Sequence, residues 1–192
     1  MPTGSKSHRG RASHFLLHPF DDERGTVSVS VQPSLQDTYR DVMAGVCTPV
    51  SVVTAMAGDR PHGTTVSAFA SLSMTPPMAL VSLDRGSQLL SLIRLTGRFG
   101  INVLGSSQSA LALAFACKGD TKFDGVTWAV EDGVPRLEGA PGWLACEVAD
   151  FVEGGDHVLA LGQVVAADRR AGPPLTYHGR VFGTHSVLET QN

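Results

Sequence analysis

Hydroxyl side chains recur at every second position on either side of residue 69, and this spacing is the feature of the sequence that most suggests chemistry. Thr65 and Ser67 precede Phe69, and Ser71 and Ser73 follow it. On one continuous β-strand such alternate positions share a face, while the apolar residues between them turn to the opposite face and enter a core. The sequence therefore predicts a hydroxyl-bearing strand, which suits a ligand that is flat, partly apolar and tailed by phosphate.

A second group of polar residues lies in the turn after the next apolar strand. Asp84, Arg85 and Gly86 lead to Ser87, which precedes a helical pattern. Unpaired backbone N–H groups at the start of a helix, together with the helix dipole, favour a phosphate, and Arg85 adds positive charge. An ordinary capped helix has the same sequence features, so the residues alone leave both interpretations open.

Two further segments combine a polar group with a ring. Lys122 can meet a phosphate as a point charge, and its neighbour Phe123 can stack against a ligand ring. Two glycines precede Asp156 and His157 and permit a close approach of the backbone to a ligand, which His157 can then contact. A solvated lysine, a core phenylalanine and a turn held by an Asp–His hydrogen bond are the structural alternatives.

Several common site motifs are missing from the sequence. It contains no G-x-G-x-x-G or Walker loop, no H-E-x-x-H or clustered His/Cys spacing, and no G-x-S-x-G elbow. These motifs mark the commonest nucleotide, metal and hydrolase sites. We therefore expect no metal site and no catalytic side chain that acts as an acid or base.

Composition narrows the class of protein further. The chain has 192 residues, 42% of them hydrophobic, and a formal net charge of −3, which predicts one domain with a real core and no basic field for nucleic acid or a membrane. Three cysteines far apart in sequence indicate a reduced, cytoplasmic chain. Residues 1–30 predict a flexible N-terminal tail, and residues 31–192 predict the folded domain.

The elements that must position these residues follow from periodicity and turn signals. Helices are expected to begin at Ser34, Ser87 and Ser106, and strands are expected over residues 50–56, 78–83, 99–104, 143–152, 157–167 and 175–182 besides the hydroxyl-bearing strand. Residues 120–142 show little periodicity. Because strands and helices do not alternate regularly, about seven strands and three helices favour an antiparallel barrel with helical insertions over a doubly wound sheet.

Taken together, these segments resemble the short-chain flavin reductase family, the reductase partners of two-component flavin monooxygenases. The landmarks, in order, are Gly45-Val46, His62-Gly63, Thr65-Val66-Ser67, Pro76-Pro77, Ser87, Phe99, Ile101-Asn102-Val103-Leu104, Lys122-Phe123 and Gly155-Asp156-His157. The resemblance implies a mainly β fold, the FMN-binding split β-barrel, and a homodimer with the flavin near the subunit interface. The high Ala, Gly and Arg usage is compatible with a bacterial source. The resemblance also implies transfer of a hydride from NAD(P)H, with NADH favoured over NADPH, to FAD or FMN as a diffusible substrate. The reduced flavin then supplies a partner monooxygenase.

The resemblance also assigns roles to residues. It implies that the flavin is bound by Thr65, Val66, Ser67, Ala68, Ser71, Asp84, Arg85, Ser87, Lys122 and Phe123, and that the nicotinamide nucleotide is bound by Asp156, His157 and Phe182. The sequence departs from the family at Phe182, where a tyrosine is frequent, and at Thr64, where Met or Phe is common.

Two alternatives belong to other classes. A flavin-binding electron carrier with the same barrel has no productive nicotinamide site, and NADH oxidation with added flavin separates it from a reductase. A barrel that binds single-stranded nucleic acid is disfavoured by the net negative charge and by the lack of a basic aromatic face.

Overall fold

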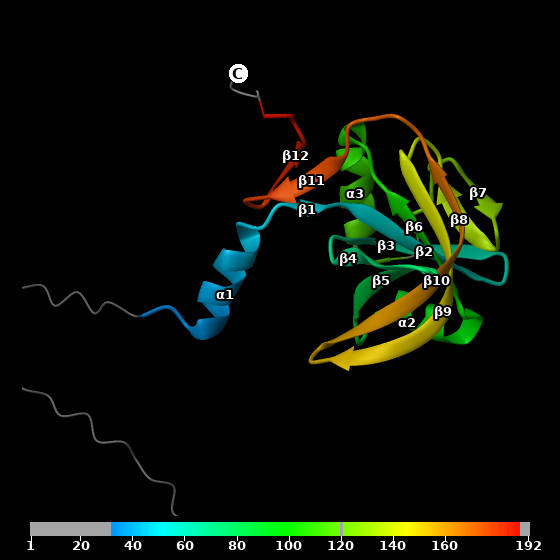
Figure 1. Cartoon of the computed structure of the whole chain (residues 1–192), viewed down its shortest axis with the longest axis horizontal. Helices are drawn as coiled ribbons and strands as arrows, with labels where there is room; N and C mark the ends of the chain where they lie inside the picture. Colours follow the sequence, from blue (N-terminus) through cyan, green and yellow to red (C-terminus); the bar gives the residue numbers. More distant parts are fainter. Residues whose placement is uncertain (1–31, 120, 189–192) are drawn as a thin grey trace, which may run out of the picture. The chain divides into compact units, whose positions relative to one another are not determined.

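The computed structural model describes residues 32–119 and 121–188 (Figure 1). By compactness the chain divides into two units, Met1–Ser34 and Leu35–Asn192. Every helix and strand described below belongs to the second unit. The tail predicted over residues 1–30 lies outside the described residues and stays a prediction.

A seven-stranded sheet forms the body of the domain, and its strand order is β3-β2-β6-β9-β10-β5-β4. Its strands are β2 (Ser51–Ala57), β3 (Arg60–Val66), β4 (Phe69–Met74), β5 (Pro77–Asp84), β6 (Arg98–Val103), β9 (Gly142–Gly154) and β10 (His157–Arg169). All the neighbouring pairs are antiparallel. The expected antiparallel, mainly β architecture is therefore confirmed.

The two edge strands of this sheet are consecutive in the sequence. Only Ser67 and Ala68 separate the end of β3 from the start of β4, and the Ala68 carbonyl accepts a hydrogen bond from the Ser82 amide of β5 (2.8 Å). The sheet is thus a barrel split between β3 and β4. The expectation of one continuous hydroxyl-bearing strand is wrong, because the chain leaves one edge of the sheet at Ser67 and joins the other.

Two small sheets contain four strands that were not predicted as separate elements, together with β11, which lies in the strand expected over 175–182. One has the order β1-β11-β12, and the other is the pair β7-β8. Their strands are β1 (Thr48–Pro49), β7 (Trp128–Glu131), β8 (Val134–Leu137), β11 (Leu175–His178) and β12 (Val181–Thr184). The described residues thus form twelve strands rather than about seven.

Tight turns explain part of this difference in the number of strands. Gly179 and Arg180, both at positive φ, divide the single strand expected over 175–182 into a hairpin. Asp132 and Gly133, also at positive φ, join β7 to β8 in a region where no strand was expected. Two-residue turns with positive φ at both positions match the twist of paired strands.

The helices are α1 (Leu35–Ala44), α2 (Gln88–Thr96) and α3 (Ser109–Ala116), with the short 3₁₀ helix η1 (Ser106–Gln108) before α3. Helix α2 buries Leu89, Leu90 and Ile93 and ends at Gly97 in the left-handed conformation, as a C-terminal glycine predicts. Helix α1 also has the expected apolar face, but it buries no residue.

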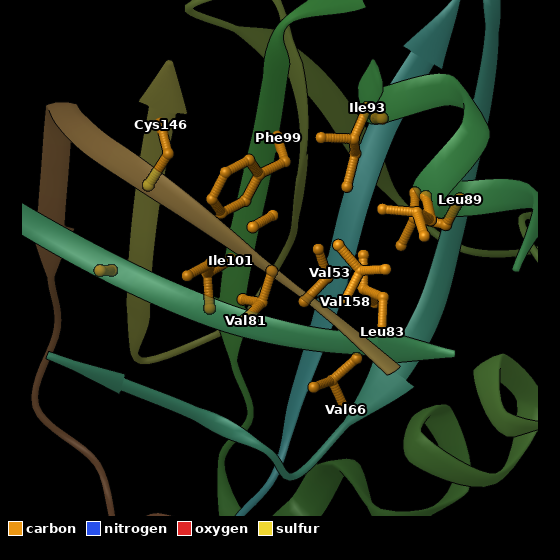
Figure 2. Packing of buried hydrophobic residues seen from close by; sticks show 14 residues of the cluster. Val53, Val66, Val81, Leu83, Leu89, Ile93, Phe99, Ile101, Cys146 and Val158 are labelled. Atoms are coloured by element: carbon orange, nitrogen blue, oxygen red, sulfur yellow. The ribbon is translucent and has the colours of Figure 1, made fainter. Parts of the chain in front are cut away.

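The main core lies inside the curved sheet, beneath α2. In Figure 2, Leu89 and Ile93 of α2 point toward Val53, Phe99 and Val158 of the strands. A second cluster packs α3 against β2 and β11, with Phe115 fully buried in it. The end of β3 contacts both clusters, because Val66 packs in the main core and the Thr65 hydroxyl donates to the carbonyl of Ala112, which belongs to the second.

Candidate functional site

A hollow of about 270 Å³ opens where the two edges of the barrel meet. We call it the edge hollow. It brings together seven of the residues predicted from the sequence, and these are Thr65, Val66, Ser67, Ala68, Asp84, Ser87 and His157. They come from four segments of the chain: β3, the link to β4, the end of β5 with the turn into α2, and the start of β10.

Sheet register explains how distant segments meet here. The first residue of β10, His157, pairs with the last residue of β5, Asp84. The Asp84 carboxylate then accepts a hydrogen bond from the Gly86 amide (2.7 Å), and the Asp84 carbonyl accepts one from the Ser87 amide (2.9 Å). This side chain therefore shapes the turn that delivers Ser87 to the hollow. Ser87 precedes α2, but its hydroxyl makes no cap hydrogen bond.

The hydroxyls of the original run have different surroundings. The Thr65 hydroxyl donates to the Ala112 carbonyl of α3 (2.6 Å), which fixes the side chain while its lone pairs can still accept. Ser67 is exposed beside the hollow. Ser71 lies on β4, paired with Ala79 of β5, and it does not line the edge hollow. Its predicted role in flavin binding stays a prediction.

The side chain of Arg85 makes its contacts with the β9–β10 turn. Its guanidinium donates to the Gly155 carbonyl (2.8 Å) and forms an ion pair with Glu153, and its amide donates to the Asp156 carbonyl (2.9 Å). Arg94 of α2 joins the same Glu153 carboxylate (3.2 Å). Arg85 thus fastens the β9–β10 turn to the β5–α2 turn and does not line the edge hollow.

Lys122 and Phe123 also lie away from the edge hollow. The Lys122 ammonium donates to the carbonyls of Gly63 (3.2 Å) and Phe115 (3.1 Å), and burial lowers its pKa. Phe123 packs edge-on against Phe115 (4.8 Å between ring centroids) and Trp128 (5.5 Å). Both side chains therefore connect α3 to β3 and to the second core.

Asp156 and His157 form a pair at the tip of the β9–β10 hairpin. The distance between His157 Nδ1 and Asp156 Oδ1 is 2.8 Å. This hydrogen bond, and the charge of His157, lower the pKa of the Asp156 carboxyl. The carboxylate thereby orients the imidazole, whose other edge can contact a ligand in the edge hollow.

Phe182 lies on the other side of the same β3 segment. It lines an open hollow of about 500 Å³, here called the apolar hollow, together with Leu113 and Val181. Thr65 and Ser67 belong to both hollows. Phe182 packs edge-on against Tyr177 at 5.4 Å between ring centroids.

Three further residues line the edge hollow and were not among the predicted binding residues: Thr64, Ser82 and Leu83. Ser82 had a usable signal, because it is the single polar residue in the apolar strand 78–83. Thr64 had been noted only as a departure from the family pattern.

The described residues give no sign of a metal site. In residues 32–119 and 121–188, no group of three or more His, Cys, Asp and Glu side chains could hold an ion. The same part of the chain contains no helix with the length and apolar character needed to span a membrane. The edge hollow offers hydroxyls, apolar walls and one imidazole, which suits binding and alignment of rings.

Comparison with known proteins agrees with this geometry. Residues 43–186 match the family described as flavin reductase like domain. The reductase component of a 4-nitrophenol 4-monooxygenase/4-nitrocatechol 2-monooxygenase from Rhodococcus opacus is 39% identical over 153 residues, which are 80% of this chain and 83% of that protein. The FMN reductase (NADH) SmoA from Agrobacterium fabrum is 35% identical over 150 residues, 78% of this chain and 86% of that protein.

A solved structure supports the same relationship. The NADH:FAD oxidoreductase SgcE6 of Streptomyces globisporus, in complex with NAD and FAD fragments, superposes with a TM-score of 0.76 at 30% identity, covering 84% of this chain and 98% of that one. The matched region contains both edge strands, the β5–α2 turn and the β9–β10 hairpin, since these all lie within residues 43–186. The chain belongs to the flavin reductase-like family.

Proposed function

We propose that this protein is an NADH-dependent flavin reductase, which reduces free FAD or FMN and supplies the reduced flavin to a partner monooxygenase. The observation that carries the proposal is the edge hollow, where segments from three parts of the sheet and the start of α2 converge. Relatives named as NADH-dependent flavin reductases and as reductase components of monooxygenases support it.

The residues of the edge hollow fit a flavin. Val66, Ala68 and Leu83 provide apolar wall for the isoalloxazine ring, and the hydroxyls of Ser67 and Ser87 face the same space for the ribityl chain and phosphate. Such a mixture of apolar walls and a few placed polar groups is typical of small-molecule sites. We include Arg85, Lys122, Phe123 and Ser71 among the flavin-binding residues as predictions that rest on the family resemblance.

The bound flavin and nicotinamide supply the redox chemistry themselves: a hydride passes from C4 of NADH to N5 of the flavin, and a proton from solvent completes the reduction. The chain's residues hold the two rings in contact. His157, oriented by Asp156, faces the nicotinamide, and Phe182 limits the space on the opposite side of Thr65. Alignment is the main contribution of the protein, since well-oriented reactants at roughly 3–3.5 Å gain most of their rate from proximity.

We further propose that the protein acts as a homodimer. Helix α1 presents an apolar face with nothing packed on it among the described residues: Leu35 is 81% exposed, Tyr39 65% and Val42 63%. The apolar hollow offers a second uncovered face with Leu113 and Val181. Contiguous exposed apolar surface of this kind marks an association site.

We place the protein in the cytoplasm, because Cys47, Cys117 and Cys146 are all free thiols.

Absorbance at 340 nm tests the activity. Purified protein is mixed with NADH and, separately, FAD, FMN and riboflavin. NADH oxidation that scales with added flavin supports the proposal and identifies the preferred flavin. Tight flavin binding without turnover with any of the three contradicts it and favours an electron carrier.

A further inference from the structure

The tip of the β9–β10 hairpin is held by charged side chains to which the proposed function gives no part in the reaction. Strands β9 and β10 run side by side (Figure 1), and the two residues between them, Gly155 and Asp156, form the turn. His157 follows directly and lines the edge hollow. Because His157 is bonded to the turn, the position of its imidazole depends on how firmly the turn is held.

Both carbonyl groups of this turn accept hydrogen bonds from Arg85. Its guanidinium donates to the Gly155 carbonyl (2.8 Å), and its amide donates to the Asp156 carbonyl (2.9 Å). The Arg85 side chain is half exposed, and a long side chain loses much rotamer freedom when it is fixed in one position. Holding the guanidinium on the Gly155 carbonyl is therefore easier with a further partner.

Glu153 is that partner, and it binds a second arginine at the same time. One oxygen of its carboxylate forms an ion pair with Arg85, and the other lies 3.2 Å from Nη2 of Arg94 in α2. The Arg94 guanidinium also lies over the Phe151 ring, 5.4 Å from its centroid, at a distance where a cation and a ring attract. Phe151 and Glu153 are alternate residues of β9 and so share a face. One carboxylate thus links the hairpin both to α2 and to the turn before it.

The shared carboxylate makes Glu153 more important than either arginine. Single ion pairs between exposed side chains contribute little, whereas charges that form a network contribute more. Loss of Arg94 leaves Glu153 bound to Arg85, and loss of Arg85 leaves it bound to Arg94. Loss of Glu153 breaks both contacts at once, so the hairpin tip is released from α2 and from the turn together.

We propose that Glu153 is a positioning residue for the reduction: through Arg85 it fixes the Gly155–Asp156 turn and so holds His157 against the nicotinamide. The inference rests on the proposed function, because it takes His157 as a contact of the nicotinamide. Glu153 itself does not line the edge hollow. Its loss therefore acts on the Michaelis constant for NADH and leaves kcat and the Michaelis constant for the flavin unchanged.

Steady-state kinetics of the full chain test this role. Glu153→Ala should raise the Michaelis constant for NADH about fivefold, as expected for two contacts between exposed charges, with changes of less than about twofold in kcat and in the constant for the flavin. Glu153→Gln should restore most of the loss, because its amide oxygen still accepts a hydrogen bond from one guanidinium. A rise of the same size for NADH and for the flavin overturns the proposal.

Glu147→Ala is the matched control. Glu147 lies on the same strand, is half exposed like Glu153, and forms an ion pair with Arg98. It lines neither the edge hollow nor the apolar hollow. Its loss should therefore change each kinetic constant by less than about twofold, and an effect on NADH equal to that of Glu153→Ala overturns the proposal.

The sign of the effect separates positioning from charge. Removal of a carboxylate makes this side of the protein more positive, which by itself attracts an anionic dinucleotide. Charge alone would therefore lower the Michaelis constant for NADH in Glu153→Ala, whereas loss of positioning raises it. A lowered constant overturns the proposal.

A double variant tests whether Glu153 acts through Arg85. If it does, Arg85→Ala/Glu153→Ala raises the Michaelis constant for NADH no further than Glu153→Ala alone, because effects within one network are not additive. Independent effects of about threefold for Arg85→Ala and about fivefold for Glu153→Ala would multiply to about fifteenfold. A rise of that size overturns the proposal.

Amide hydrogen exchange without substrates separates this inference from the proposed activity. The Arg85 amide is bonded to the Asp156 carbonyl, so its exchange rate reports how firmly the turn is held. We expect faster exchange in Glu153→Ala than in the wild type or Glu147→Ala. If this occurs but the wild type does not oxidise NADH, the contact stands and both the reductase function and the role of Glu153 in it are overturned. If the wild type oxidises NADH rapidly and Glu153→Ala changes neither exchange nor kinetics, the reductase function stands and the role of Glu153 alone is overturned.

Discussion

The two hollows on either side of Thr65 and Ser67 differ in how completely this chain builds them. The edge hollow has its walls tied together within the subunit, through Arg85 to Gly155 and through Asp84 to Gly86. The apolar hollow is bordered by exposed apolar side chains such as Val181, 64% exposed. The edge hollow thus has its walls fixed within one subunit, whereas the apolar hollow exposes side chains that the proposed dimer would cover. Under the proposed function, the ring-binding side and the subunit-contact side share Thr65 and Ser67 of one short segment.

The largest effect should come from placing a charge on the exposed apolar face of α1, which we propose lies in the dimer interface. Val42→Asp introduces a carboxylate on the apolar face of α1, and burying it against a second copy carries a large desolvation cost. We expect the dissociation constant of the dimer to rise about a hundredfold or more, measured by sedimentation over a concentration series. Val165→Asp is the matched control, since Val165 is 45% exposed on β10. Equal effects of the two variants would remove α1 from the interface.

The polar site is tested most directly at His157. His157→Ala should raise the Michaelis constant for NADH about tenfold, the loss expected for one polar contact of about 1.4 kcal/mol, with a smaller change for the flavin. Steady-state rates at varied NADH and varied flavin give both constants. Equal effects on both substrates would count against the place of His157 beside the nicotinamide.

Lys122 distinguishes a structural lysine from a phosphate ligand. Lys122→Met removes two hydrogen bonds to backbone carbonyls, including one at the end of α3, and should lower the free energy of unfolding by about 1–2 kcal/mol. Urea denaturation measures this change. If Lys122 instead contacts the flavin phosphate, the variant weakens FMN binding and leaves riboflavin binding unchanged.

A smaller effect is expected when the hairpin is released from the β5–α2 turn. Arg85→Ala removes the side-chain contacts to Gly155 and Glu153 and loosens the segment that carries His157. We expect a rise of about threefold in the Michaelis constant for NADH, as for an exposed ion pair worth 0.2–1 kcal/mol. Arg94→Ala, which loses its bond to Glu153 but leaves Gly155 bound, is the control. A larger effect in the control would mean that α2, and not the turn, holds the hairpin.

The smallest effect concerns acid stability at the hairpin tip. The pKa of Asp156 is lowered from 3.8 by the hydrogen bond to His157 and by its charge, so this pair contributes stability above the ordinary pKa and loses it as the pH falls through the lowered value. Asp156→Asn should therefore flatten the dependence of stability on pH below about 5. Thermal unfolding from pH 3 to 6 provides the measurement, and an unchanged slope would contradict the pairing.

The regular parts of the fold could be predicted from local sequence. The strands predicted over residues 143–152 and 157–167 correspond to β9 and β10. The spacing of apolar residues and the terminal Gly97 likewise predict helix α2. The sequence did not predict elements that are short or are interrupted by a turn. The four-residue strands of β7 and β8 are too short for a period to emerge, and the turn at Gly179 and Arg180 has a positive-φ residue that sequence rules seldom anticipate.

For the site, local sequence identifies the residue types that are available: a run of hydroxyls, an Asp–Arg–Gly–Ser turn and an Asp–His pair after two glycines. Which of these residues meet depends on the tertiary fold. The two edge strands β3 and β4 separate Thr65 from Ser71, and the pairing of β10 with β5 places His157 beside Asp84. The tertiary fold also places backbone carbonyls beside Arg85 and Lys122, which donate hydrogen bonds to them. Local sequence gives no signal for such contacts, because packing determines which carbonyl lies nearby.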